Sequence, residues 1–372
     1  SGIIDSIPTI TEMILKEITH GATNRTRGAE GMTADQVFCA AIIKQHESFS
    51  YEELAFHLVD SHTYRNFCRI GIADKGFKKS SLCQNIKSIS PETWESCNRL
   101  LAAYGEDTEF EKGKEVRIDC TVVSSNIHEP TDSSLLFDCV RVFSRLTKRA
   151  KDELGIDVYV NDHTKRAKRR DLEIQNSKTE KARLKLYKDL LKVTKKTVGY
   201  ASQVLSELKS CAFSGTDKLA LAITIEKDLE ELIPLSEQVM NQTTRRVIFG
   251  EKVPAQEKIV SIFEPHTDII IKDRRDTHYG HKICLTQGRS NFISDCLIVE
   301  GNPADSTLTT EMLDRHDQVF GRYPNKAALD GGFASRANLE AAKSRGIKDV
   351  CFAKGRGLTE EDMCRSHRVY RR

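Results

Sequence analysis

The segment Val116-Arg117-Ile118-Asp119-Cys120-Thr121-Val122-Val123 decides the fold class of this chain. Its β-branched residues and its apolar side chains at alternate positions predict a β-strand. Aspartate is depleted in strands and is seldom buried without a partner. Asp119 is therefore expected to be paired, to lie exposed at an edge or to bind a metal ion.

A second aspartate stands in a similar position further along the chain. Ala327-Ala328-Leu329-Asp330 predicts a short strand that ends at Gly331-Gly332, where glycines let a backbone or a ligand approach closely. If a sheet brings Asp119 and Asp330 together, convergent carboxylates can hold Mg²⁺ ions at a phosphodiester. The alternative is that each is a strand-end aspartate satisfied by the protein itself, and the residues alone favour that alternative.

The second half of the chain alternates between strand and helix patterns. We predict further strands at 268–271, 281–285, 294–299 and 349–352, and helices at 308–320 and 336–343. Strands that alternate with helices indicate a parallel portion of sheet, which here follows antiparallel hairpins. The predicted fold class is α/β with a mixed sheet.

Residues 1–112 are predicted to be all helical. Thr33, Ser50 and Ser90 each precede an apolar run and are typical N-cap residues. Several short helices with tight turns could form a helix-turn-helix DNA reader, although a bundle that only packs would show the same pattern.

Residues 148–245 are predicted to form a helical insertion. Apolar residues follow a three-and-four spacing from Leu184 to Leu208, which predicts a coiled-coil-like seam. A returning helix from Leu219 to Met240 is expected to be interrupted at Pro234. A self-standing coiled-coil dimer would show the same seam.

The charge is distributed unevenly along the chain. The net charge is only +3, yet residues 141–196 carry 18 Lys or Arg against 8 Asp or Glu. A cluster in this segment could neutralise the phosphates of double-stranded DNA, and a solvated helix face is an equally good interpretation. The candidate DNA-binding residues are Lys165, Arg166, Lys168, Arg169 and Arg170.

The remaining features exclude other protein classes. No apolar run approaches the roughly 20 residues of a membrane span, and the N-terminus lacks both an initiator Met and a signal peptide, so we expect an intracellular protein whose natural start is missing. The 11 cysteines form no C-x-x-C pair, which fits a reducing compartment. His278 and His281 resemble half of a metal site but have no second pair, so zinc is not expected.

Several of these stretches also match a known family. Residues 117–136 closely resemble the first catalytic block of DDE transposases in the ISNCY and related insertion-sequence groups. Residues 261–267, 279–282 and 329–335 are similar to further blocks of that family, and residues 50–58 and 63–67 look like its helical N-terminal domain. The resemblance covers nearly the whole chain.

The resemblance implies both a fold and a chemistry. It implies an RNase H-like catalytic domain formed by residues 113–147 and 246–372, with Asp119 and Asp330 as its first two metal-binding carboxylates. The implied activity is Mg²⁺- or Mn²⁺-dependent cleavage of double-stranded DNA at element ends and strand transfer to target DNA. The family further implies a homo-oligomer in bacterial or archaeal cytoplasm, associated with the nucleoid.

The chain departs from the family pattern at the third carboxylate. It should be a Glu on a helix after the last strand, and we expect it beyond Arg372, with Glu360 and Glu361 as weaker candidates. The 372-residue chain is therefore expected to bind metal poorly and to be catalytically deficient. The rival hypothesis is a non-catalytic DNA-binding or assembly protein with a decayed transposase core, whereas a purely structural coiled-coil protein does not account for the α/β half.

Overall fold

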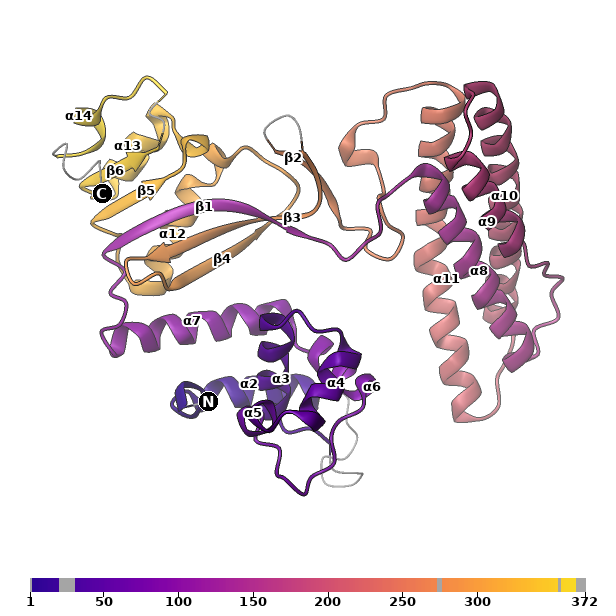
Figure 1. Ribbon diagram of the computed structural model, residues 1–372, viewed down its shortest axis with the longest axis horizontal. Helices are drawn as coiled ribbons and strands as arrows, with labels where there is room; N and C mark the ends of the chain where they lie inside the picture. Colours follow the sequence, from indigo (N-terminus) through magenta and orange to yellow (C-terminus); the bar gives the residue numbers. More distant parts are fainter. Residues whose placement is uncertain (1, 20–30, 273–275, 354–355, 366–372) are drawn as a thin grey trace. The chain divides into compact units, whose positions relative to one another are not determined.

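The structure is a computed structural model, and it describes residues 2–19, 31–272, 276–353 and 356–365. Figure 1 labels the helices and strands of the chain, and the contacts between residues divide it into two compact units. Unit 1 comprises Ser1–Cys120, Cys284–Leu297 and Ala304–Arg372, and unit 2 comprises Thr121–Ile283 and Ile298–Pro303. Each unit is described by itself.

Unit 1 begins with short helices that pack around an apolar core. Phe38, Leu54 and Leu58 are buried in this core, and the Trp94 ring stacks on Phe38 with 5.6 Å between centroids. The predicted caps are confirmed, because the side chains of Thr33, Ser50 and Ser90 accept hydrogen bonds from the first turns of their helices. The helices are α1 (Gly2–Asp5), α2 (Pro8–Ile18), α3 (Ala34–His46), α4 (Tyr51–Asp60), α5 (His62–Phe67), α6 (Lys79–Lys87) and α7 (Pro91–Asp107).

A mixed, open six-stranded sheet follows, which confirms the α/β class. Its main order is β2-β3-β1-β5-β6, and β4 also pairs with β3. The β1–β5 and β5–β6 pairs are parallel, whereas β2 and β3 are antiparallel. The strands are β1 (Glu115–Ser124), β2 (Asp268–Lys272), β3 (Asp276–Gly288), β4 (Ile293–Val299), β5 (Lys326–Leu329) and β6 (Asp349–Phe352).

The parallel part of the sheet has one buried and one exposed face. Val116 and Ile118 on β1 are buried, as are Ala327 and Leu329 on β5. Helices α12 (Thr309–Phe320) and α13 (Arg336–Ser344) contribute buried side chains to the same unit. The short helix α14 (Glu360–Met363) follows β6. On β1 and β5, the side chains that alternate with the buried ones face outward.

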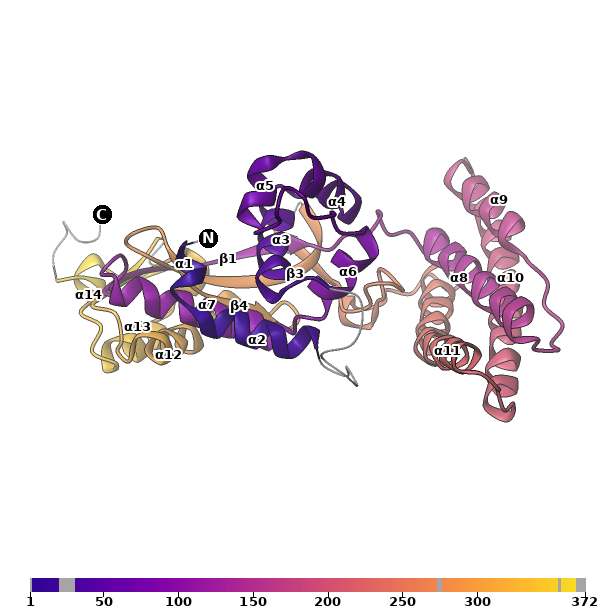
Figure 2. The same cartoon turned by 90° about the horizontal axis from the view of Figure 1, so that it is seen from below.

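Unit 2 contains a bundle of long helices that lie side by side in both views (Figures 1 and 2). Leu136, Phe143, Leu190 and Ile225 are among the buried residues of its core. None of the helices in the described ranges is long and apolar enough to cross a membrane. The bundle helices are α8 (Asp132–Leu154), α9 (Thr164–Gln175), α10 (Glu180–Ser210) and α11 (Thr216–Thr243).

Two expectations for this region differ from the structure. The resemblance places residues 113–147 in the catalytic domain, but α8 packs on α9, α10 and α11, and the division between units falls after Cys120. The reason is that the apolar face of α8 is covered by helices of its own unit. Pro234 does not interrupt its helix, because α11 runs continuously through it. Proline removes one backbone hydrogen bond, and buried Leu229 and Val239 hold the helix on either side.

Candidate functional site

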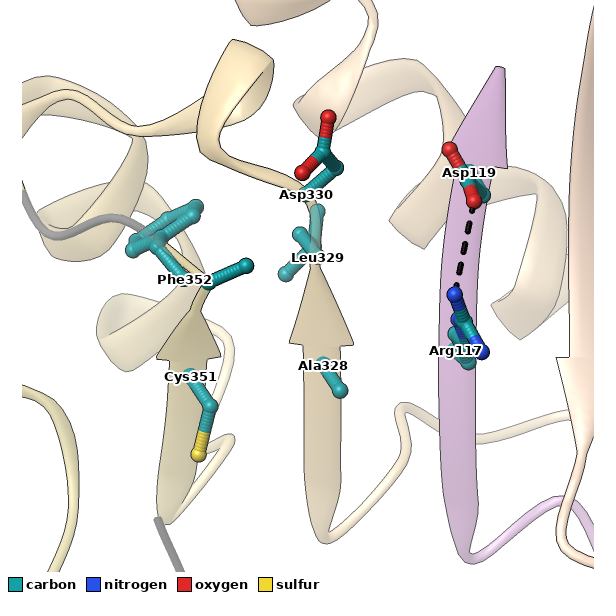
Figure 3. Close-up of a pocket in the computed structure, with 8 residues that line it drawn as sticks. Arg117, Asp119, Ala328, Leu329, Asp330, Cys351 and Phe352 are labelled. Atoms are coloured by element: carbon teal, nitrogen blue, oxygen red, sulfur yellow. Dashed lines mark ion pairs between the residues drawn. The ribbon is translucent and has the colours of Figure 1, made fainter. Parts of the chain in front are cut away.

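The pairing of β1 with β5 places the two predicted aspartates next to each other. The register pairs Arg117 with Ala328 and Ile118 with Leu329, so the next position along both strands is occupied by Asp119 and Asp330. Adjacent strands lie about 4.8 Å apart, and residues opposite each other in a parallel pair point to the same face. The two carboxylates therefore belong to one end and one face of the sheet (Figure 3).

This face is open to solvent. A cavity of about 380 Å³ lies over it, and both aspartates line it. The side chain of Asp119 is 52% exposed, which explains how an apolar strand accommodates an aspartate: the side chain lies on the polar face, between buried Ile118 and half-buried Cys120. The other lining residues are Arg117, Ala328, Leu329, Cys351, Phe352 and Ala353.

The positively charged side chain of Arg117 lies beside one of the two carboxylates. The Nη2 atom of Arg117 lies 3.6 Å from Oδ2 of Asp119 (Figure 3), and both side chains are more than half exposed. An exposed pair of this kind contributes little to stability. The sequence patterns did not single out Arg117, although its position two residues before Asp119 places it on the same face of the strand.

The glycines after Asp330 are explained by a contact within the protein. A Cβ atom at Gly332 would lie 2.5 Å from Oδ2 of Asp305, so no larger residue fits without movement. The close approach predicted for Gly331-Gly332 is therefore made by another part of unit 1. It does not by itself indicate a ligand.

Among the residues that the structure describes, two carboxylates rather than three line this cavity. Within the described ranges, no cluster of three or more His, Cys, Asp or Glu side chains is placed to hold a metal ion. Glu360 and Glu361 lie at the start of α14, where Thr359 and Asp362 form a capping box, and neither glutamate lines the cavity. The residues Val369–Arg372 of the predicted final helix lie outside the described residues.

The five candidate DNA-binding residues fall into two groups. Arg166 and Arg170 both pair with Asp189 on α10, and Arg170 also pairs with Glu173 at 2.6 Å. These two arginines form ion pairs that link α9 to α10, so their charge is largely neutralised within the bundle.

The other three candidates lie on the outer side of α9. Arg169 has a long contact of 3.9 Å with Glu173. Lys165 and Lys168 are exposed, and no carboxylate of the described residues forms an ion pair with either. These lysines keep the charge that phosphate binding would need.

The histidines of β3 do not form the pair that their spacing suggested. His278 and His281 are an odd number of residues apart, so they point to opposite faces of the strand. His281 instead lies against His266, with 3.2 Å between Nε2 and Nδ1. His266 in turn lies 3.2 Å from Glu264, and the sequence pattern did not reveal this contact because 15 residues separate the two histidines.

Comparison with known proteins provides no relative from which a role could be transferred. No family model matches the chain, no curated protein matches it, and no solved structure matches it.

Proposed function

We propose that this chain is a DDE-type transposase of the ISNCY-type insertion-sequence group, with an RNase H-like catalytic core in which Asp119 and Asp330 bind Mg²⁺ or Mn²⁺. The observation that carries the proposal is the register of β1 and β5, which continues from Ile118 and Leu329 to the two aspartates. This register places both carboxylates on the exposed face of the sheet, where they line one cavity. The mixed sheet and the sequence blocks around both residues support the same proposal.

The residues of the site fit a divalent cation. Carboxylate oxygens are the ligands that Mg²⁺ prefers, and Mg²⁺ is commonly held by one or two carboxylates together with substrate phosphates. When bound, the ion would supply Lewis-acid activation of a phosphodiester and of the attacking hydroxyl group. Asp119 and Asp330 would position the ion, and Arg117 adds a positive charge that can attract the phosphate backbone.

A metal-dependent cleavage assay tests this proposal. The protein, expressed from its complete reading frame, is incubated with a supercoiled plasmid that carries the DNA flanking its gene, with Mg²⁺, Mn²⁺ or EDTA. We expect nicking that requires the metal. Asp119→Asn or Asp330→Asn should each reduce the nicking rate by more than roughly 10- to 100-fold, because that is the cost of losing a residue that only supports a metal ligand. Glu340→Gln, at an exposed position of α13 outside the cavity, is the matched control and should keep the activity. Undiminished nicking in both aspartate variants would refute the mechanism.

A second candidate is a non-catalytic DNA-binding or assembly protein with a decayed transposase core. The observation in its favour is that, in the described part of the chain, two carboxylates and not three line the cavity. This candidate predicts salt-sensitive DNA binding by the wild-type protein, with no metal-dependent nicking under any of the conditions above. The same assay therefore separates the two candidates.

A further inference from the structure

Helix α10 carries a row of lysines along one face. Lys181, Lys185, Lys188, Lys192 and Lys195 follow each other at intervals of four and three residues, and all five are exposed. Residues at this spacing lie on the same side of a helix. We call these five residues the lysine row. From Lys181 to Lys195 it is about 21 Å long at 1.5 Å per residue.

The described part of the protein does not neutralise the lysine row through ion pairs. None of its members forms an ion pair with a carboxylate of the described residues. Asp189 is the only acidic residue between Lys181 and Lys196, and it is already bound to Arg166 and Arg170 of α9. Packing of α9 on α10 therefore engages the one acidic side chain that α10 carries between Lys181 and Lys196.

The packing of α10 also limits the kind of partner. Its apolar face, which includes Leu190, Val193 and Val198, is buried in the bundle core. A helix that binds a membrane surface needs an apolar face free to enter the lipid. Binding of single-stranded nucleic acid relies on exposed aromatic side chains, and Tyr187, the only aromatic residue between Lys181 and Lys195, is buried.

We propose that the lysine row of α10 is a docking surface for the sugar-phosphate backbone of duplex DNA. Lysine acts as a point charge toward phosphate and does not read bases, so the contact is independent of sequence. The length of the row corresponds to roughly six base pairs at 3.4 Å each. The choice of DNA as the partner rests on the proposed function, but the surface is separate from the aspartate site and is tested separately.

The experiment measures the salt dependence of DNA binding. Anisotropy of a fluorescent 20-base-pair duplex is titrated with the wild-type chain and with the triple variant Lys185→Gln, Lys188→Gln, Lys192→Gln at several salt concentrations, without divalent ions. Each lost phosphate contact lowers the slope of log K against log salt by about 0.9. We expect the triple variant to lose between two and three units of slope and at least tenfold in affinity at low salt.

Two control variants keep the result interpretable. The variant Lys218→Gln, Lys227→Gln, Lys252→Gln removes the same charge from exposed positions of unit 2 outside the row, and we expect it to change the slope by less than one unit. The variant Lys185→Arg, Lys188→Arg, Lys192→Arg retains the charges and should bind like the wild type. Equal effects of the two glutamine variants, or wild-type binding by the row variant, would overturn the inference.

The outcomes distinguish this inference from the proposed function. If the row variant binds normally while Asp119→Asn abolishes nicking, only the inference is wrong. If the row variant loses DNA binding while no protein nicks DNA, the row is supported and the catalytic proposal is wrong. Binding to vesicles of phosphatidylserine and phosphatidylcholine with no binding to the duplex would overturn the row as a DNA surface.

Discussion

Asp119 and Asp330 occupy opposite positions on adjacent parallel strands, one step beyond the pair of Ile118 and Leu329. The arrangement follows from a simple alternation, because Ile118 and Leu329 turn inward to the core and the next residue on each strand must turn outward. A shift of one residue in the pairing of β1 with β5 would offset the two carboxylates along the strands and disturb the burial of Leu329. The same packing that stabilises the sheet therefore also sets the spacing of the candidate ligands.

Arg117 should compete with a divalent cation for Asp119. Its guanidinium lies 3.6 Å from the carboxylate, so Arg117→Ala should lower the Mn²⁺ concentration needed for half-maximal binding. Stability should change by less than about 0.5 kcal/mol because the pair is exposed. The measurement is a Mn²⁺ titration followed by paramagnetic broadening of Asp119 and Asp330 signals. Arg289→Ala removes the same charge from another exposed position and serves as control; an equal effect of both variants would count against a specific competition.

Replacing Gly288 with a larger residue should destabilise the protein only while the Glu111 side chain is present. The Glu111 carboxylate is buried and accepts hydrogen bonds from the Gly113 amide at 2.9 Å and from the Ser290 amide and hydroxyl at 3.0 and 2.5 Å. A Cβ atom at Gly288 would collide with this carboxylate. We expect Gly288→Ala and Glu111→Ala each to destabilise by about 1 to 3 kcal/mol.

The double variant tests the contact directly. Its destabilisation should be smaller than the sum of the two single effects by at least about 1 kcal/mol, because removing the carboxylate makes room for the new methyl group. Gly199 is a control, since a Cβ atom there would touch nothing within 4 Å, and Gly199→Ala in helix α10 should stabilise by roughly 0.5 to 1 kcal/mol. Strictly additive effects in urea denaturation would show that the two residues do not interact.

Acid should weaken this part of unit 1. Burial alone would raise the pKa of Glu111, but the hydrogen bonds from Ser290 and Gly113 outweigh it and lower the pKa below its usual value. A carboxyl whose pKa is lowered by folding stabilises the protein above its unfolded pKa, about 4.3 for Glu, and this contribution is lost as the pH falls through the folded pKa. Glu111→Gln should therefore flatten the pH dependence of unfolding below about pH 4.3. An unchanged profile would contradict this assignment.

His128 should give the opposite pH dependence in unit 2. Its Nε2 atom lies 2.7 Å from Oδ2 of buried Asp138, and this hydrogen bond raises the pKa of His128. The stabilisation is complete below the unfolded pKa, about 6.5, and is lost as the pH rises through the folded pKa. The effect should be modest because His128 is half exposed. An NMR titration of the ring should show a pKa above 6.5 that returns toward 6.5 in Asp138→Asn.

Local patterns predicted much of the fold. Alternation of apolar and polar residues located β1, and hydroxyl caps such as Ser50 located the starts of helices, because both signals depend only on neighbours in the sequence. The placement of Asp119 within a strand and of Asp330 directly after one could be predicted for the same reason, whereas the pairing of the two strands could not.

Contacts between distant segments could not be predicted in this way. The apolar face of α8 would suit a sheet as well as a bundle, so its sequence does not reveal that α10 and α11 cover it. Likewise, the five basic residues between positions 165 and 170 look equivalent in the sequence. The structure shows that Asp189, about 20 residues away, pairs with Arg166 and Arg170. The distinction between structural arginines and free lysines needed the structure.

Cys351 and Cys364 should form a disulfide when the protein is oxidised. Their Sγ atoms lie 2.9 Å apart, and both residues are free thiols in the structure. Reaction with diamide would remove one hydrogen from each thiol, reduce the diamide to its hydrazine and join β6 to the residue after α14. Burial and the neighbouring Cys364 raise the pKa of Cys351 to about 12. Little of the Cys351 thiolate is therefore present at neutral pH, and oxidation should accelerate as the pH rises.

Mass spectrometry distinguishes this pair from the other cysteines. Treated protein should lose two hydrogens, and a Cys351–Cys364 peptide should appear that is absent in Cys351→Ser and in Cys364→Ser. Exposed Cys211 should be alkylated before either of them in the reduced protein. Closing so short a loop should stabilise unit 1 by up to about 3 kcal/mol, measured as a shift in the urea midpoint that dithiothreitol reverses. Preferential alkylation of Cys351 over Cys211 would show that the thiol pair is not packed as described.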